Sequence, residues 1–357
     1  MRRFLERVRK ALTVIMNGGP RLKLDSQPRR TPAVTVAIPT RGNDLSLLAR
    51  CLSSLGSQSF RDFEIIIVCP RPDEIAVLCR SHGATALAEN DGSPAAKRNM
   101  AVENAAGSLI SFLDDDCEVP MTWLERVVTV FQQHPCVSCL GGPDLTPSDD
   151  GISAWAVAVG AFDTSRMTGL ALDRAAVNKI KTANATYRRE VFKAATFNPR
   201  TLYGDELELN MRLVQEGYHL RFDPDVFVWH RQTRGRVGLF NGLAYLFRCS
   251  IASAPILASW RTFTFARDES FLAWFYFSVL MLPLMVGLLW ASPFAFCCVV
   301  AVSLLAYTMF TVLRANVTRV DVICAIPFFA VLTTLTRAVG FYIGLIRYVI
   351  DRARSNI

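Results

Sequence analysis

The chain has 357 residues, of which 51% are hydrophobic and 20% are charged, and its mean hydropathy is +0.27. These values exclude an intrinsically disordered chain, a collagen-like repeat and a small disulfide scaffold. From Phe271 to Leu313 there is no Asp, Glu, Lys, Arg or His. Since a membrane-crossing helix takes about 20 apolar residues, this run is long enough for two crossings. The sequence predicts an integral membrane protein with a large water-facing part.

The net charge of +8 lies almost entirely in residues 1–32, where many Arg and Lys residues face only Glu6 and Asp25. The charge therefore belongs to an N-terminal arm, and we expect no nucleic-acid partner. Apolar residues recur at helical spacing in residues 1–16, which indicates a basic amphipathic segment at an anionic membrane surface. A flexible basic tail is the alternative.

Residues 33–140 alternate between short apolar runs and helical patterns. The expected strands are Val34–Ile38, Phe63–Val68, Thr85–Ala88, Ser108–Leu113 and a strand near Val137–Leu140. The expected helices are Asp44–Leu55, Asp73–Ser81, Pro94–Ala105 and Thr122–Gln133. This alternation predicts an α/β domain with a mostly parallel sheet flanked by helices. In such a sheet, ligands bind at the carboxyl ends of the strands.

The sequence from 141 to 231 is less regular. A helix is expected over Arg188–Ala195 and a clearer one over Asp205–Gly217, and strand-like pieces follow at Leu220–Asp223 and Val226–Trp229. We expect the catalytic domain to cover 33–231.

Residues 232–270 form a basic and apolar segment without acidic residues until its end, which is typical of an interfacial layer at the headgroups. A transmembrane domain is expected over 271–357, with spans at about 271–290, 293–313 and 322–346. The third span conflicts with the positive-inside rule, because it exports Arg347, Arg352 and Arg354. Gly340 and Gly344 form a lone GxxxG packing signal.

The strongest chemical feature is Asp114-Asp115-Asp116, directly after an apolar strand. Adjacent carboxylates repel one another, and a hard cation such as Mg²⁺ or Mn²⁺ relieves that repulsion. On an extended segment, Asp114 and Asp116 point to the same side and form the natural pair. The alternative is a solvated acidic turn.

Three further groups could take part in chemistry. Lys97-Arg98-Asn99 places cations where a diphosphate leaving group needs them, although it could be an exposed basic patch. Asp205 and Glu206 begin a helix, where a carboxylate can act as a general base or only favour the helix dipole. His230 could be a metal ligand or a structural histidine.

Taken together, VAIPTRG, AAKRN, SLISFLDDD, NATYRREVF and YGDELELNMRLVQEGYHLRFDPDVFVWH resemble inverting family 2 glycosyltransferases with a GT-A fold. The resemblance covers about residues 33–231. The apolar C-terminal part looks like that of family members that glycosylate lipid-linked acceptors.

The resemblance implies roles for the matching positions. Asp114 and Asp116 match the carboxylates that hold the metal, Mg²⁺ or Mn²⁺, and the nucleotide-sugar diphosphate. His230 matches a histidine that often follows the acidic helix. The matching donor-side positions are Pro39, Thr40, Arg41, Arg98 and Asn99.

On the acceptor side, Asn184 matches a recurrent asparagine, and Arg231 and Arg234 lie where the domain ends. The catalytic base matches Glu206 by position, but the order here is Asp-Glu rather than Glu-Asp, so Asp205 stays a competitor.

Two departures from the family pattern affect specificity. Val68-Cys69-Pro70-Arg71 stands where family members carry an acidic group that reads the base, so the nucleotide is left open. The Gln-x-x-Arg-Trp motif of processive synthases is absent, which favours transfer of a single sugar.

We therefore expect a membrane-anchored inverting glycosyltransferase that uses a nucleotide-diphospho-sugar donor and a lipid-linked or glycan acceptor in surface glycan biosynthesis. Cysteines without a disulfide or zinc framework favour a cytosol-facing catalytic domain in a bacterial inner membrane. The alternatives are a polyprenyl-phosphate sugar synthase and a catalytically inactive family member that scaffolds a membrane assembly.

Overall fold

A computed structural model describes residues 31–90, 92–145, 180–201, 203–231, 239–258, 281–315 and 320–355. The chain divides into two units, Met1–Thr31 and Pro32–Ile357, and the fold below is that of the second. The amphipathic segment expected in residues 1–16, Arg234, and the first ten residues of the span expected at 271–290 lie outside the described ranges.

The centre of the domain is a seven-stranded sheet with the order β3-β2-β1-β4-β8-β6-β9. Its strands are β1 (Val34–Pro39), β2 (Phe63–Cys69), β3 (Thr85–Ala88), β4 (Leu109–Leu113), β6 (Val137–Gly141), β8 (Asn184–Arg188) and β9 (His219–Phe222). All of them run parallel except β8, which pairs antiparallel with both β4 and β6. The mostly parallel sheet predicted from the alternation is confirmed.

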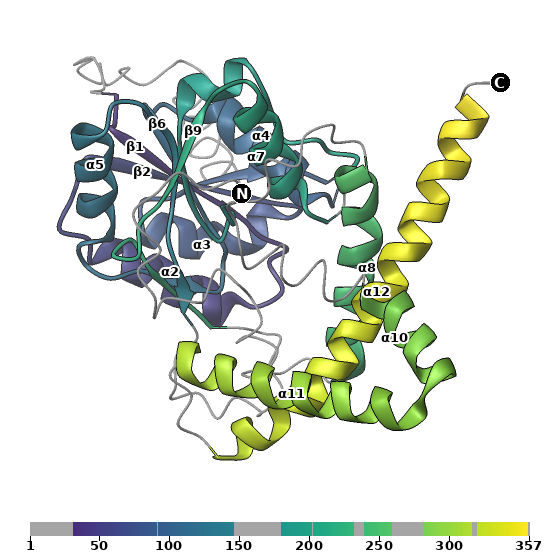
Figure 1. The fold of residues 1–357 in the computed structure, drawn as a ribbon. Helices are drawn as coiled ribbons and strands as arrows, with labels where there is room; N and C mark the ends of the chain where they lie inside the picture. The colour runs from purple at the N-terminus through teal and green to yellow at the C-terminus, as the bar shows by residue number, and fades with distance from the viewer. Residues whose placement is uncertain are drawn as a thin grey trace, which may run out of the picture. The chain divides into compact units, whose positions relative to one another are not determined.

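Helices cover both faces of this sheet (Figure 1). Successive side chains of a strand point to opposite faces, so β1 sends Val34, Val36 and Ile38 to one core and Ala37 to the other. The first core is closed by α2 (Leu45–Gly56), α3 (Pro72–Ser81) and α5 (Trp123–Gln133). The second is closed by α4 (Pro94–Asn104) and α7 (Asp205–Gln215).

The segment Asn184–Ala195 differs from the prediction. Instead of a helix over Arg188–Ala195, β8 runs to Arg188 and a short 3₁₀ helix, η2 (Arg189–Lys193), follows it. Ser111 and Thr186 join β4 to β8 through a 2.8 Å hydroxyl–hydroxyl hydrogen bond. Unlike β1, β2 and β4, the segment Asn184–Arg188 is not an apolar run, and pairing with its two sheet neighbours determines its conformation.

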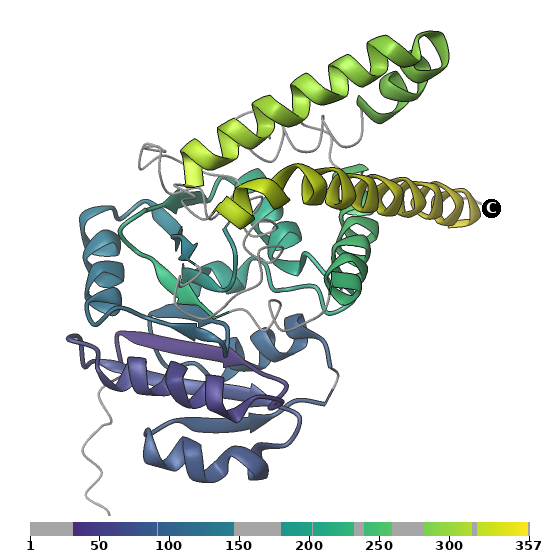
Figure 2. The ribbon, with the colours of Figure 1, turned by 90° about the horizontal axis from the view of Figure 1, so that it is seen from below.

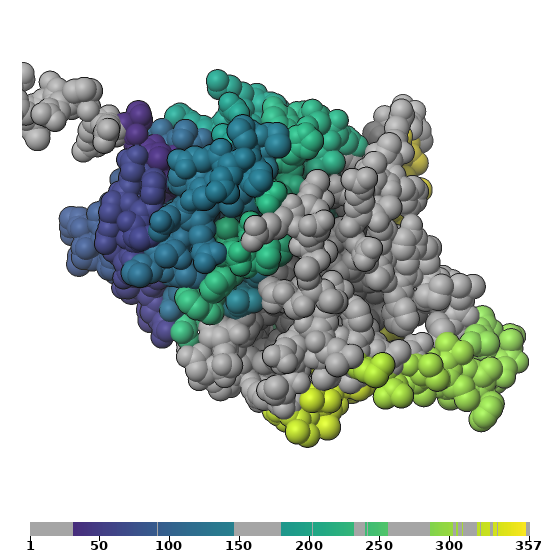
Figure 3. Space-filling view, turned by 60° about the vertical axis from the view of Figure 1, so that its left-hand side comes forward, coloured from purple at the N-terminus to yellow at the C-terminus, as the bar shows by residue number. Residues whose placement is uncertain are grey.

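A second, three-stranded sheet has the order β5-β10-β7. It consists of β5 (Cys117–Glu118), β7 (Asp144–Leu145) and β10 (Val228–His230). Gly142 allows the close approach of the chain here, because a Cβ at that position would lie 1.7 Å from the Val226 carbonyl oxygen. In Figure 3 the green residues that end the domain lie against the blue-teal residues of the β4–β7 region. This sheet joins the segment after β4 to the last strand of the domain.

Four further helices are described: α8 (Leu239–Ala258), α10 (Met281–Ala291), α11 (Pro293–Ala315) and α12 (Val320–Ser355). Figure 2 shows α10 and α11 as a hairpin and α12 as one long helix. In the described part of the chain, one helix is long and apolar enough to cross a membrane, Ile323–Arg354, which is most of α12.

The helices α8 and α12 pack closely through the two glycines of the GxxxG signal. A Cβ on Gly340 would lie 2.7 Å from the Phe247 carbonyl oxygen, and one on Gly344 would lie 2.4 Å from that of Ile251. Small residues at such positions let two helix backbones approach each other.

Candidate active site

The predicted site residues gather where the order of the sheet reverses. β1 lies between β2 and β4 and is parallel to both. The chain runs outward from β1 to β2 and β3, and α4 then returns it across β1 to β4. Thr40 and the triplet Asp114–Asp116 follow the carboxyl ends of these two strands. Open α/β sheets bind ligands at such a crevice.

The acidic triplet forms a turn and not an extended segment. The Cys117 backbone N–H donates to the Asp114 carbonyl oxygen at 3.1 Å, which closes the turn. Asp114 and Asp116 were expected to point to the same side. In the turn, the three carboxylates point in different directions instead. Each carboxylate approaches a different element, and this separates the three negative charges.

The middle carboxylate, Asp115, accepts a hydrogen bond from the Thr40 hydroxyl. The same hydroxyl accepts the Gly42 backbone N–H at 2.9 Å, so the β1–α2 loop is fastened to the triplet. Burial raises the pKa of Asp115 to about 6; the Thr40 hydrogen bond opposes this rise, and the charges of Asp116 and Asp114 add to it. Thr40 thus links the β1–α2 loop to the middle carboxylate of the triplet.

The first carboxylate, Asp114, lies near the buried guanidinium of Arg98 on α4. Arg98 Nη2 is 4.0 Å from Asp114 Oδ1, and Nη1 is 2.5 Å from Asp205 Oδ2. Burial alone would lower the pKa of Arg98, but Asp205 and Asp114 raise it above its ordinary value, so the guanidinium stays charged. Its Nε is buried and has no hydrogen-bond partner in the described part of the chain. Arg98 thus places a fixed positive charge between the triplet and α7.

The helix α7 begins with the two candidate bases. Gly204 precedes it with φ +77°, a left-handed conformation that glycine adopts readily. Asp205 is buried and ion-paired with Arg98, whereas Glu206 is half-buried. The two carboxylates therefore have different environments, although they are adjacent in sequence.

The third carboxylate, Asp116, meets His230 at the end of β10. His230 Nε2 is 3.0 Å from Asp116 Oδ1, and Nδ1 is 3.3 Å from Asp144 Oδ2. Lys181 Nζ lies 3.4 Å from the same Asp144 oxygen. Burial opposes charge on the ring, yet Asp116 and Asp144 raise the pKa of His230 to about 10. Asp116, His230, Asp144 and Lys181 thus form a largely buried chain of polar contacts that begins at the last carboxylate of the triplet.

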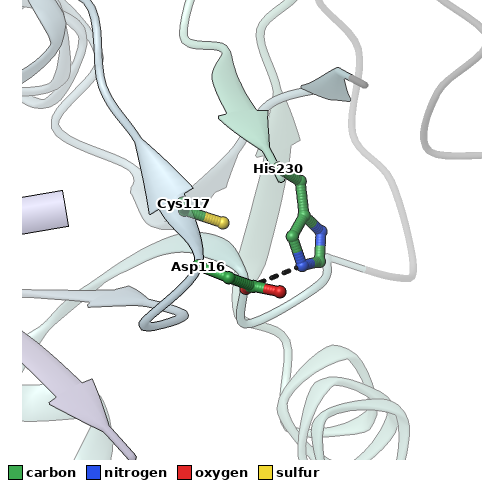
Figure 4. A group of neighbouring side chains, drawn as sticks. All are labelled: Asp116, Cys117 and His230. Atoms are coloured by element: carbon green, nitrogen blue, oxygen red, sulfur yellow. Dashed lines mark ion pairs between the residues drawn. The ribbon is translucent and has the colours of Figure 1, made fainter. Parts of the chain in front are cut away.

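The donor set at this point fits a divalent cation. Asp116, Cys117 and His230 each offer one ligand atom, and these atoms all lie within 4.8 Å of one another (Figure 4). Asp116 and Asp144 each lie within hydrogen-bond distance of a nitrogen of the His230 ring, and two carboxylates placed in this way stabilise positive charge. Asp114, which the sequence pairs with Asp116, faces Arg98 instead.

Among the predicted donor residues, Asn99 contacts another part of the domain. Asn99 donates through Nδ2 to the Phe197 carbonyl oxygen at 2.8 Å and accepts the Phe197 N–H at 3.0 Å. Its amide therefore holds the loop after η2. Pro39 ends β1, and Arg41 is exposed in the loop that Thr40 fastens.

The predicted acceptor-side residues are also engaged with the domain. Asn184 is buried: it accepts from Trp123 Nε1 at 3.1 Å, and its Nδ2 donates to the Val226 carbonyl oxygen at 2.6 Å. The Arg231 N–H donates to the Asp116 carbonyl oxygen at 2.9 Å, and its side chain binds Glu118. Asn184 thus connects β8 to α5 and to the Val226 backbone, and Arg231 connects the end of β10 to Asp116 and Glu118.

The sequence analysis did not single out Asp144 or Cys117. Asp144 follows β6, whose carboxyl end lies at the same edge of the sheet as that of β4. An acidic residue after a second strand at that edge is a signal that could have found it. Cys117 follows the triplet directly, but as a lone cysteine it carries no spacing signal.

The comparisons with known proteins agree with this geometry. Residues 35–195 match the family model described as Glycosyl transferase family 2. The chain is 27% identical over 210 residues to glycosyltransferase AglE of Haloferax volcanii, a match that covers 56% of this chain and 67% of that protein. It is 24% identical over 205 residues to the pre-mycofactocin glycosyltransferase of Mycobacterium tuberculosis, with 55% of this chain and 42% of that protein covered. The chain thus spans less than half of the second relative.

One solved structure shares the fold over most of the chain. It is the mannosyltransferase PcManGT from Pyrobaculum calidifontis in complex with GDP-Man and Mn²⁺, with a TM-score of 0.56, 18% identity and 88% of each chain covered. The sheet order and this likeness define a GT-A nucleotide-diphospho-sugar transferase fold. Residues 35–195 therefore form a domain of Glycosyl transferase family 2.

Proposed function

We propose that the protein is a membrane-anchored, metal-dependent, inverting glycosyltransferase that moves one sugar from a nucleotide-diphospho-sugar to a lipid-linked acceptor. The observation that carries the proposal is the position of Arg98. Its guanidinium lies between Asp114, on the candidate donor side, and the start of α7, which holds the candidate base. The Arg98 guanidinium would therefore lie between the leaving diphosphate and the attacking hydroxyl.

The donor side is assigned to the triplet and its neighbours. Asp116 and His230 would hold a Mg²⁺ or Mn²⁺ ion, and Asp114 lies beside the Arg98 guanidinium. When bound, the ion neutralises the charge that builds on the leaving diphosphate. The Arg98 guanidinium, with its buried Nε, stabilises the same charge from the other side. Mn²⁺ and GDP-Man are bound by PcManGT, which has the same fold.

We assign Glu206 as the base. Asp205 is buried and ion-paired with Arg98. It is a poor proton acceptor, because its protonation would leave the buried Arg98 guanidinium without its main counter-charge. Glu206 is next in the chain and remains half-buried. The acceptor oxygen attacks the anomeric carbon while the bond to the diphosphate breaks. The electron pair leaves on the diphosphate oxygen, the hydroxyl proton passes to Glu206, and the anomeric centre inverts.

The acceptor and the membrane are inferred from the C-terminal half. The stretch Ile323–Arg354 can cross a bilayer by length and composition, and it ends in basic residues. The chain from Arg231 to Arg267 contains many arginines and no acidic residue, which suits an anionic lipid headgroup or diphosphate. These features favour a catalytic domain beside the cytoplasmic face of a bacterial inner membrane and an acceptor carried by a lipid.

The experiment supplies detergent-solubilised protein with Mn²⁺, a panel of radiolabelled GDP-, UDP-, dTDP- and CDP-sugars, and lipid extract from the source cells. We expect one donor to label an organic-soluble product, with loss of labelling on chelation. An acid-labile monophosphodiester product would identify a polyprenyl-phosphate synthase instead. Absence of labelling with every donor, together with absence of nucleotide binding, would indicate an inactive scaffold.

A further inference from the structure

Cys117 lies at the metal centre in a position that the catalytic scheme does not use. It is the first residue of β5, directly after the triplet, and is fully buried. It pairs with His230 in the antiparallel register of β5 and β10. Residues directly opposite each other in such a pair carry their side chains on the same face. The Cys117 sulfur and the His230 ring therefore share one side of the small sheet, as Figure 4 shows.

The three side chains offer oxygen, sulfur and nitrogen within ligand reach. The ligand atoms of Asp116, Cys117 and His230 all lie within 4.8 Å of one another. Mg²⁺ prefers oxygen ligands, whereas thiolate and imidazole ligands suit Zn²⁺. A donor set of this composition leaves a fourth position open for water or a diphosphate oxygen, as catalytic zinc sites do.

The surroundings of His230 orient it for such an ion. Its Nδ1 faces Asp144, which Lys181 supports in turn. A hydrogen bond from Nδ1–H to a carboxylate leaves Nε2 as the ligand atom and fixes the plane of the ring. Nε2 is the atom that faces Asp116 at 3.0 Å.

We propose that Asp116, Cys117 and His230 bind a thiophilic divalent cation, with Zn²⁺ as the type, and that this ion excludes Mn²⁺ or Mg²⁺ from the donor site. Binding would form a metal–sulfur bond and a metal–nitrogen bond, and the Cys117 thiol proton and the His230 Nε2 proton would pass to solvent. The ion replaces the hydrogen bond between His230 and Asp116. Asp116 would then be a ligand of the Zn²⁺ ion and could no longer bind the Mg²⁺ or Mn²⁺ ion of the donor site. This inhibitory consequence rests on the proposed function, whereas the binding itself does not.

The test uses the full-length protein in detergent and Co²⁺ as a spectroscopic substitute for Zn²⁺. Cobalt bound to a thiolate gives a sulfur-to-metal charge-transfer band, and we expect this band at one equivalent of Co²⁺ and its loss when Zn²⁺ is added. Cys117→Ser should remove the band and weaken Zn²⁺ binding at least about tenfold. Asp116→Asn, which keeps the thiol, should weaken binding similarly.

The matched control is Cys79→Ser, because Cys79 is also a buried thiol but lies on α3. It should keep the band. A band that survives in Cys117→Ser, or none in the unmodified protein, overturns the proposal. If Cys117→Ser does not fold, the Asp116→Asn variant decides in the same way.

A second readout separates this inference from the proposed function. Binding of a nucleoside diphosphate in the presence of Mn²⁺ should fall as Zn²⁺ is added, and Cys117→Ser should resist that fall. A cobalt band without nucleotide binding contradicts the proposed function alone. Nucleotide binding without a cobalt band contradicts the zinc site alone.

Discussion

Arg98 and Asp205 form a buried ion pair that joins α4 to the first turn of α7, although 107 residues separate them in the chain. Arg98 Cζ also lies 5.6 Å from the centre of the Phe197 ring, which adds a cation–π contact on the apolar side. The pair holds the start of α7 against the acidic triplet. The ion pair also gives the two candidate bases different environments, because Asp205 is buried against Arg98 and Glu206 is half-buried.

The first prediction concerns stability. Asp205→Asn leaves Arg98 buried without its main counter-charge, and removing one partner of a buried pair costs about 3 kcal/mol or more. We expect a clearly lower thermal unfolding midpoint in detergent. Asp225→Asn is the control, because its pair with Arg126 is exposed on both sides and contributes little. Equal midpoints for the two variants would contradict a stabilising role of the Arg98–Asp205 pair.

The second prediction concerns the base. Glu206→Gln should lower the rate of nucleoside diphosphate release from the donor by about 10²- to 10⁴-fold, because the acceptor hydroxyl keeps its proton. The dissociation constant for the nucleotide should stay the same. Glu208→Gln, in the same turn but ion-paired with Arg212 at 2.8 Å, should keep the rate. A normal rate in Glu206→Gln would assign the proton transfer elsewhere.

Much of the fold could be predicted from the sequence. The buried strands Val34–Pro39 and Phe63–Cys69 are apolar runs bounded by polar residues and proline, and the helix between them, α2, carries leucines at helical spacing. The strand β8 and the two-residue strands β5 and β7 were not predicted, because they are not apolar runs and form where neighbouring strands complete their hydrogen bonds. The third strand of the small sheet, β10, overlaps the strand-like piece expected at Val226–Trp229.

The arrangement of the candidate site could be predicted only in part, because many of its contacts join residues that are far apart in the chain. The acidic triplet, Arg98 and His230 carry strong local or family signals, and the structure brings them together. The contacts of Asp116 and Asp144 with the site depend on His230 in β10, which lies more than 80 residues after Asp144 in the chain. No local pattern records such a contact.

The third prediction tests how α7 is held. The buried Tyr187 hydroxyl donates to Asn210 Oδ1 at 2.9 Å, and Asn210 Nδ2 donates to the Ile180 carbonyl oxygen at 2.7 Å. Tyr187→Phe keeps the ring but removes the donor to a buried acceptor, so the free energy of unfolding should fall by about 1–3 kcal/mol. Tyr218→Phe, a half-buried ring against the same core, should change it little. An unfolding midpoint unchanged in Tyr187→Phe would contradict the role of this bond.

The fourth prediction tests the α8–α12 packing. Gly344→Val forces a side chain into the Ile251 backbone, where even a Cβ would lie at 2.4 Å. We expect a loss of about 1–3 kcal/mol and a lower yield of detergent-stable protein. Gly287→Val on α10 is the control, because nothing lies within 4 Å of a Cβ there. If both variants behave alike, the close approach of α8 and α12 is not what stabilises this part of the chain.

The most direct measurement is the binding of UDP, GDP, dTDP and CDP to the detergent-solubilised protein by calorimetry, with and without Mn²⁺, beside Asp116→Asn. The account predicts that one nucleotide binds only with Mn²⁺, and that the asparagine variant, which cannot hold the ion against His230, does not bind it. Binding of the same strength without Mn²⁺, or in Asp116→Asn, would contradict a metal-dependent donor site built on the acidic triplet.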